Sequence, residues 1–187
     1  MEITRTPRLI LRTWRPEDAP AFHAMNQDPR VIEFLPGPMS MAQVEAFIAA
    51  QQEMFARTRA CYFAAEVAGT GALAGFVGLK SHRLDSPVVL PFAPCTDIGW
   101  RLAAEHWGKG YATEGARACL DYGFEVMGLA EIVSFTVPDN LRSRAVMEKL
   151  GMREDAGGAF AHPALAPDHR LSRHVLYRLR RGEARAA

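Results

Sequence analysis

The segment from Asp97 to Glu114 constrains the fold of this chain more than any other. An apolar run, 97–102, is followed by Trp107-Gly108-Lys109-Gly110 and then by a helical pattern that begins near Ala112. Two glycines separated by one residue let the backbone turn sharply, and the first N–H groups of the next helix lack intrahelical partners. The segment therefore predicts a strand, a glycine loop and a helix whose N-terminus binds phosphate. The alternative is a tight turn that binds no ligand.

A second motif lies downstream of the glycine loop. It begins at Asn140, continues through the helical pattern 141–150 and ends at Gly151-Met152. The strand-like run 132–137 precedes it. Gly151 suits a left-handed helix cap, so this region predicts a strand, a helix opened by Asn140 and a second strand after the cap.

The two motifs, in this order and separated by one helix and one strand, resemble the Gcn5-related N-acetyltransferase (GNAT) superfamily. The closer resemblance is to its RimJ/RimL-like branch of ribosomal-protein N-terminal acetyltransferases. It extends from about Thr6 to Arg180, with specific motifs only from Asp97 onward. The resemblance implies an enzyme that transfers an acetyl group from acetyl-CoA to a primary amine by direct attack. A non-catalytic acyl-CoA-binding sensor is the alternative.

The resemblance also implies an α/β fold, in which a mostly antiparallel twisted sheet of about six or seven strands carries about four helices. Local patterns agree with it. Alternating and apolar runs predict strands at 9–12, 61–67, 73–79, 97–102, 132–137, 152–155 and 174–180. Helical spacing and capping signals predict helices from Arg15 to about Asp28, from Ser40 to about Arg57, after the glycine loop, and over 140–150. Three prolines between Asp85 and Cys95 predict an ordered loop beside the substrate pocket.

The resemblance assigns the cofactor site residue by residue. Backbone groups near Trp100 would bond the pantetheine arm where the strand separates from its neighbour, and the glycine loop would bind the pyrophosphate. The predicted coenzyme A contacts are Trp100, Arg101, Leu102, Trp107, Gly108, Lys109, Gly110, Tyr111, Ala112, Thr113, Asn140, Ser143 and Arg144. The basic stretch from Asn140 to Arg153 fits this assignment, since coenzyme A carries phosphates that need cationic neighbours. A solvated helix face is the alternative for that stretch.

The proton donor for the departing thiolate is the least typical part of the motif. Many relatives have a tyrosine seven residues after the asparagine, but here that position is Met147, which has no proton to give. The RimJ/RimL-like branch implies the serine three residues after the asparagine, which is Ser143. Ser143 is therefore the predicted acid, with a hydrogen bond at the helix start as its alternative role. Asn140 bonds the cofactor, caps the helix, or does both.

The general base is open among Asp97, Glu154, His162 and water. Asp97 is the first choice because it begins the cofactor strand, although a solvated or capping carboxylate is its alternative. An α-amine, with a pKa of about 7.7–8.0, is about 10–20% neutral at pH 7, whereas a lysine at about 10.4 is neutral to less than about 0.1%. An α-amine therefore needs little help from a base. The expected acceptors are a protein N-terminus or a small-molecule amine.

Composition narrows the remaining classes. At 187 residues the chain predicts a single N-acetyltransferase domain over 1–187. It has no apolar stretch near the roughly 20 residues of a membrane span and no signal peptide, which predicts a cytoplasmic protein without a membrane partner. Three separated cysteines and six histidines form no ligand motif, so no metal site and no disulfide are expected.

Charge argues against nucleic acid as a specific partner. The formal net charge is only +1, although the stretch from Arg170 to Arg185 holds six arginines against Glu183. No aromatic-interleaved binding motif accompanies them, and a charged edge strand is the expected reading. The sequence leaves the oligomeric state open between monomer and homodimer.

Overall fold

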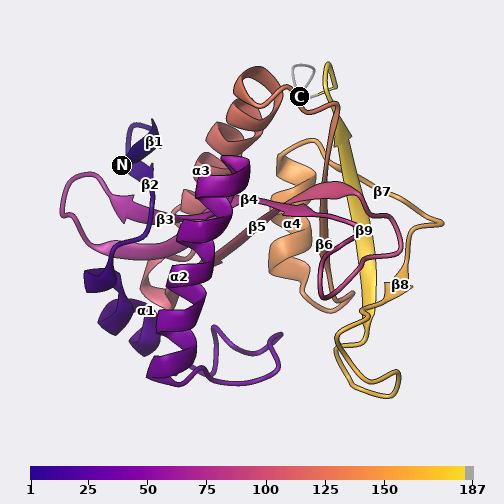
Figure 1. Ribbon diagram of the computed structural model, residues 1–187, viewed down its shortest axis with the longest axis horizontal. Coiled ribbons are helices and arrows are strands. Elements are labelled where there is room, and N and C mark those ends of the chain that lie inside the picture. The colour runs from indigo at the N-terminus through magenta and orange to yellow at the C-terminus, as the bar shows by residue number, and fades with distance from the viewer. Residues whose placement is uncertain (184–187) are drawn as a thin grey trace.

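The structure is a computed structural model, and it describes residues 1–183. Within these residues the strands follow the order β1-β2-β3-β4-β5-β6-β9-β7, and β8 pairs with β9 off this path (Figure 1). The strands are β1 (Glu2–Arg5), β2 (Leu9–Arg12), β3 (Tyr62–Val67), β4 (Leu73–His82), β5 (Cys95–Leu102), β6 (Glu131–Thr136), β7 (Arg153–Glu154), β8 (Phe160–Ala161) and β9 (Arg173–Arg180). The helices are α1 (Ala19–Met25), α2 (Met41–Thr58), α3 (Tyr111–Asp121) and α4 (Leu141–Lys149). The mostly antiparallel mixed sheet with four α-helices confirms the predicted fold class.

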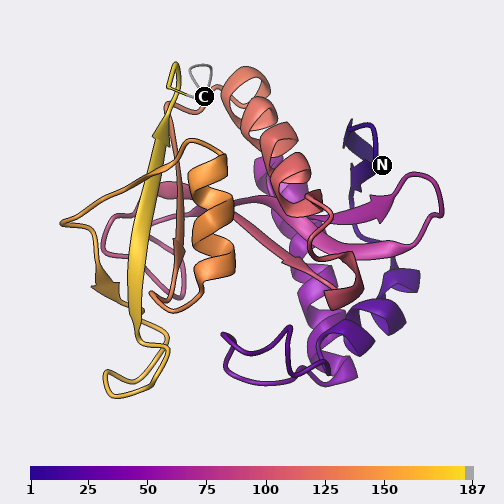
Figure 2. The same cartoon turned by 180° about the vertical axis from the view of Figure 1, so that it is seen from behind.

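Helices cover both faces of the sheet. Helices α1 and α2 lie on one face, where Trp14, Phe22 and Val44 pack against Phe76 of β4. Helices α3 and α4 lie on the other, as the view from behind shows (Figure 2). Successive side chains of a strand point to opposite faces, so β5 contributes Ile98, Trp100 and Leu102 to the α3 side. Its odd-numbered residues therefore face α1 and α2.

The two central strands β5 and β6 separate along their length. They are the parallel pair of the sheet, and they share a single registered pair, Asp97 with Val133. Ser134 adds one bond, since its hydroxyl donates to the carbonyl of Ile98 at 2.9 Å. Beyond this point β5 keeps β4 as its partner, up to Leu102 opposite Gly75. Within residues 1–183, no strand pairs with the β6-facing side of residues 100–102, where the resemblance implies contacts to the pantetheine arm.

Local signals placed several elements correctly. Ser40 and Gln43 form the predicted capping box of α2, with the Ser40 hydroxyl accepting from the Gln43 N–H. The hairpin between β3 and β4 turns at Gly71, whose φ is 72°. Gly151 has a φ of 79° after α4, which is the predicted left-handed cap.

Other elements differ from the predictions. The expected helix from Arg15 to about Asp28 is a short 3-10 turn followed by α1, which ends at Met25, where the N–H groups of Gln27 and Asp28 bond the carbonyls of Ala24 and Met25 in a turn instead of continuing the α-helix. Two further short strands, β1 and β8, were not predicted. Strand β9 is not an edge strand, since it pairs with β6 on one side and with β7 and β8 on the other.

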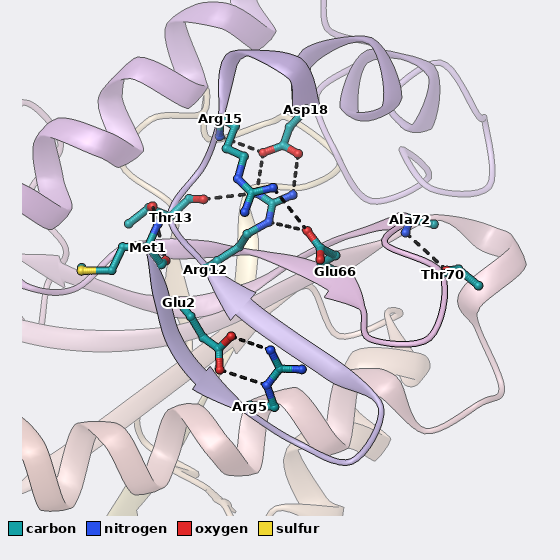
Figure 3. Close-up of polar contacts among 10 residues, drawn as sticks. All are labelled: Met1, Glu2, Arg5, Arg12, Thr13, Arg15, Asp18, Glu66, Thr70 and Ala72. Carbon is teal, nitrogen blue, oxygen red and sulfur yellow. Dashed lines mark hydrogen bonds and ion pairs between the residues drawn. The ribbon is translucent and has the colours of Figure 1, made fainter.

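A buried network of ion pairs connects strands β2 and β3 to the turn before α1 (Figure 3). The Arg12 guanidinium donates to both oxygens of Asp18, at 2.7 and 2.8 Å, and its Nε donates to Glu66 at 2.7 Å. Only 3% of Arg12 is exposed. These carboxylates raise the pKa of Arg12 above its ordinary value, so the arginine stays charged in the core.

Candidate active site

The glycine loop adopts the backbone geometry that its sequence predicts. Gly108 and Gly110 have φ values of 71° and 79°, in the left-handed region that favours glycine. Gly110 is the N-cap residue of α3, and no side chain of residues 1–183 caps that helix. The loop is held from both sides, because the Trp107 indole donates to the carbonyl of Leu102 and Arg8 donates to that of Lys109, each at 2.8 Å. The open helix N-terminus is therefore rigidly placed to bind an anion.

A cavity of about 620 Å³ lies between the separating strands and continues to this loop. Helix α4 and the segment before α2, with Val31 and Phe34, complete its wall. The cavity brings together most of the predicted site: Asp97, Trp100, Arg101, Leu102, Trp107, Gly108, Gly110, Tyr111, Ala112, Thr113, Asn140 and Ser143. This volume is within the usual range of small-molecule sites.

Two predicted contacts lie outside the cavity wall. The carbonyl of Lys109 is bonded by Arg8, and its side chain does not line the cavity. Arg144 turns away toward β9, where it donates to the Tyr177 hydroxyl at 3.1 Å and to Glu154 at 3.1 Å. The physical reason is helical geometry, since each residue turns the side chain by about 100°. Arg142, which belongs to the predicted basic stretch from Asn140 to Arg153, lines the cavity instead.

Arg142 connects three parts of the site. Its guanidinium lies 4.5 Å from the centre of the Trp107 ring and forms an ion pair with Glu33 at 2.6 Å. It thereby joins α4, the glycine loop and the segment before α2. No sequence signal identifies this contact, because the partners are far apart along the chain.

Asn140 caps α4, which is one of its two expected roles, while the other, a bond to the cofactor, remains a prediction. Its Oδ1 accepts from the backbone N–H of Ser143 at 3.2 Å, which caps α4, and it also lines the cavity. Ser143 is partly buried at the cavity wall, whereas Met147 of the next turn is buried there. The Tyr177 hydroxyl is already bonded to Arg144 and Glu154. Of these hydroxyl groups, the Ser143 one lines the cavity and the Tyr177 one does not.

Asp97 lies in the cavity wall as the centre of a buried hydrogen-bonded chain. One carboxylate oxygen accepts from the Tyr62 hydroxyl at 2.8 Å, and the other lies 2.7 Å from Nε2 of His82. Burial, together with the negative charge of Asp97, raises the pKa of Tyr62 well above its ordinary value. The carboxylate is therefore neither solvated nor a helix cap, and Tyr62 lies with it in the cavity wall.

Sequence reasoning missed Tyr62 and His82, although one signal was present. Register places Tyr62 opposite Gly78, and Gly78 opposite Gly99. A Cβ built at Gly99 would stand 3.0 Å from the Tyr62 ring. Glycine at position 99 thus leaves room for the ring, but only the strand pairing reveals why.

The other base candidates lie farther from the cavity. Glu154 is bonded to Arg144 and Tyr177 and does not line it. His162 does not line it either; its ring lies 5.1 Å from that of His174, which does. Burial lowers the pKa of both histidines. Asp97 is thus the one candidate residue of the three that lines the cavity.

Thiol and metal chemistry find little support in the described part of the chain. Residues 1–183 hold no group of three or more His, Cys, Asp or Glu residues placed to bind a metal ion. The three cysteines are free, and burial raises the pKa of Cys61 and of Cys95 to about 12. Two arginines of the C-terminal stretch form ion pairs, since Arg178 and Arg180 both contact Glu131. Arg185 lies outside the described residues.

Comparison with known proteins decides the family. A family model described as an acetyltransferase (GNAT) domain matches residues 8–153. The chain belongs to the GNAT acetyltransferase family. It is therefore an N-acetyltransferase, and the predicted resemblance to the GNAT superfamily is confirmed.

Individual relatives and solved structures are consistent with this family assignment. YkkB of Bacillus subtilis is 32% identical over 79% of this chain and 83% of its own. A GNAT acetyltransferase structure from Bacillus anthracis is 26% identical, covers 96% of this chain and 98% of its own, and superposes with a TM-score of 0.76. Mycobacterium smegmatis RimJ, solved with a CoA disulfide, shares the fold at 22% identity and a TM-score of 0.74, over 96% of this chain and 85% of its own. Among the described residues, no helix has the length and apolarity that crossing a bilayer requires.

Proposed function

We propose that this GNAT protein transfers the acetyl group of acetyl-CoA to a primary amine by direct attack within the cavity between β5 and β6. The observation that supports it is the continuity of that cavity, which joins an open helix N-terminus to the buried chain of Tyr62, Asp97 and His82. An anion site and a proton-accepting site in one cavity are what acetyl transfer from a phosphorylated thioester requires.

Different parts of the cavity bind different parts of acetyl-CoA. The N–H groups at Gly110 and the first turn of α3 bind the pyrophosphate, and Arg142 adds a positive charge at the same end. Backbone groups of residues 100–102 that face away from β4 bond the pantetheine arm, and one N–H polarises the thioester carbonyl. The thioester supplies an activated acetyl group. The protein's part is to hold its carbonyl carbon against the amine.

Proton transfer completes the reaction. The amine nitrogen forms a bond to the carbonyl carbon, and the carbon–sulfur bond breaks. The thiolate takes the proton of the Ser143 hydroxyl, while the amine passes its proton through Tyr62 or water toward Asp97. The products are the amide and free coenzyme A. Asp97 releases the amine's proton to solvent, and a proton from solvent restores Ser143. Because Asp97 is already bonded twice, an acceptor that is partly neutral at pH 7 suits this site best.

An acceptor screen tests the proposal. The full chain is incubated with acetyl-CoA and a panel of amines, amino acids and short peptides, and free thiol release is recorded. Release that depends on an amine, with the acetylated product found by mass spectrometry, supports the proposal. Tight acetyl-CoA binding without transfer to any acceptor would overturn it and favour the sensor.

A further inference from the structure

Arg101 presents a positive charge on the acceptor side of the cavity. Its Nη1 donates to Oδ1 of Asn26 at 2.6 Å, and its guanidinium lies 5.4 Å from the centre of the Phe76 ring. Asn26 is fully buried and is itself fixed by a bond to the carbonyl of Phe22. Burial lowers the pKa of Arg101 to about 10, which leaves it protonated at neutral pH. The guanidinium is thus charged, oriented and largely removed from water.

This charge has no acidic partner. Within residues 1–183 no carboxylate forms an ion pair with Arg101, and its Nε and Nη2 make no hydrogen bond. The other arginines at this cavity differ, since Arg30 pairs with Asp28 and Arg142 with Glu33. A buried charge without a partner is costly. A bound anion would remove that cost.

The surroundings of Arg101 show where an anion would lie relative to the reacting amine. Arg101, Gly99 and Asp97 are alternate residues of β5, so they share the face that points to α1 and α2. The Tyr62 ring lies over Gly99 and stacks on Phe76 at 4.8 Å. The stacked rings of Tyr62 and Phe76 thus form an aromatic surface. The Tyr62 hydroxyl and Asp97 lie at one end of it, and Arg101 lies at the other. A ligand that spans it meets a proton acceptor and a cation.

We propose that Arg101 binds a carboxylate of the acceptor, so that the substrate is a small amine that carries a carboxylate, such as an amino acid. The inference rests on the proposed acetyl transfer and deepens it. The planar guanidinium matches a carboxylate with two parallel hydrogen bonds. One unpaired positive charge balances one carboxylate, whereas a phosphate dianion would leave a negative charge uncompensated.

The same contact prepares the amine for attack. The carboxylate of a free amino acid raises the pKa of its ammonium group, because the negative charge stabilises the positive one. Pairing that carboxylate with Arg101 cancels this effect and brings the pKa toward the value of about 7.7–8.0 found for peptide α-amines. The acceptor is then partly neutral at pH 7, which suits a site whose carboxylate is already bonded.

Matched acceptors test the proposal. Transfer from acetyl-CoA is measured for amino acids and for the corresponding amino acid amides, with the parent and with Arg101→Gln. Peptides that begin with Asp or Glu form a third arm, which distinguishes an acidic N-terminus from a free amino acid. In the parent, we expect kcat/KM for a preferred amino acid to exceed that of its amide about tenfold or more, although the amide amine is the less basic. Arg101→Gln should lower the value for the acid by about ten- to hundredfold and change the value for the amide by less than about threefold.

Controls separate the possible failures. Arg30→Gln removes an arginine at the same cavity whose charge Asp28 already balances, and it should keep the preference for the acid. Arg101→Lys keeps the charge but not the paired geometry, and it should restore part of the preference. The melting temperature and the Kd for acetyl-CoA report on folding and on the cofactor site. Equal rates for acid and amide in the parent, or equal losses in Arg101→Gln, would overturn the inference, whereas no transfer to any acceptor would overturn the proposed function itself.

Discussion

At the scale of single residues, Gly110 combines a backbone conformation that favours glycine with a place in the proposed cofactor site. Its φ of 79° is left-handed, and the residue opens α3 at the point proposed to bind the pyrophosphate. Gly71, at the tip of the β3–β4 hairpin, has a φ of 72° and lies outside the cavity wall. Both positions require a left-handed backbone conformation, but only Gly110 has a proposed role in cofactor binding.

We expect Gly110→Val to weaken acetyl-CoA binding by about tenfold or more, while Gly71→Val leaves the Kd unchanged. Both substitutions force a side chain into the left-handed region, which costs roughly 1–2 kcal/mol of stability. Only the first places a side chain at the helix N-terminus proposed to bind the phosphate, where its Cβ would lie 3.4 Å from Arg8. Isothermal calorimetry with acetyl-CoA and thermal unfolding of both variants make the comparison. An unchanged Kd for Gly110→Val would place the cofactor elsewhere.

Ser143 offers a second test at this scale. We expect Ser143→Ala to lower kcat by about 10²–10⁴-fold, as loss of a general acid does, and to leave the Kd for acetyl-CoA within a few-fold. Met147 cannot replace it, and the Tyr177 hydroxyl is bonded elsewhere. Stopped-flow or steady-state thiol release gives kcat, and calorimetry gives the Kd. Parallel losses of rate and affinity would make Ser143 a cofactor contact instead.

The site residues that the sequence predicted are those with local signals. Gly108, Gly110 and Asn140 act through their own backbone or through the next turn, so a short motif identifies them. Tyr62 reaches the site from another strand, and its identification requires the register of β3, β4 and β5. Arg144 illustrates the opposite failure: a basic stretch beside the motif indicated it, but the helix turned it toward Tyr177.

At the scale of elements, small residues let α3 approach the sheet closely. A Cβ built at Gly123, just after α3, would stand 2.7 Å from Ile132 and 3.1 Å from Leu79, both buried. This close approach fixes the position of α3 against the sheet, and with it the position of the helix N-terminus.

We expect Gly123→Val to destabilise the protein by about 1–3 kcal/mol through overpacking. Gly69→Val is the control, because a Cβ at Gly69 meets no atom within 4 Å, and surface changes usually stay within about 0.5 kcal/mol. Urea unfolding monitored by tryptophan fluorescence measures both. Similar midpoints for the two variants would show that α3 accommodates the side chain by moving.

Elements with a clear local signal were predictable, and segments defined only by their partners were not. Strands β3, β4 and β6 carry enough apolar residues to be identified alone, and β7 lies within the predicted strand 152–155. Strand β8 contains only two residues, and its pairing with β9 makes it a strand. The first helix was predicted too long because its end is set by the turn bonds of Gln27 and Asp28, which no periodicity reveals.

At the scale of the whole molecule, the Arg12 network connects the turn before α1 to the paired strands β2 and β3. Strand β2 supplies Arg12, β3 supplies Glu66, and the turn before α1 supplies Asp18. The pair of Arg5 and Glu2 has the same closest distance, 2.7 Å, as that of Arg12 and Asp18, but it lies at the surface of β1. Both pairs are visible in Figure 3. Comparing the two pairs therefore separates the effect of burial on stability from the effect of the distance between the charges.

We expect Arg12→Met to destabilise the protein by about 3–5 kcal/mol, because it leaves the buried Asp18 without its counter-charge and Glu66 with only the more distant Arg15, at 3.8 Å. Arg5→Met should cost no more than about 1 kcal/mol, since exposed ion pairs contribute little. Thermal and urea unfolding, followed by circular dichroism and by fluorescence, measure both costs. If residues 1–187 form one domain, as the length predicts, the two probes will report one transition in each variant. An early separate transition in Arg12→Met would mean that β1, β2 and α1 unfold on their own, and an equal small cost for both variants would mean that the buried network contributes no more than a surface pair.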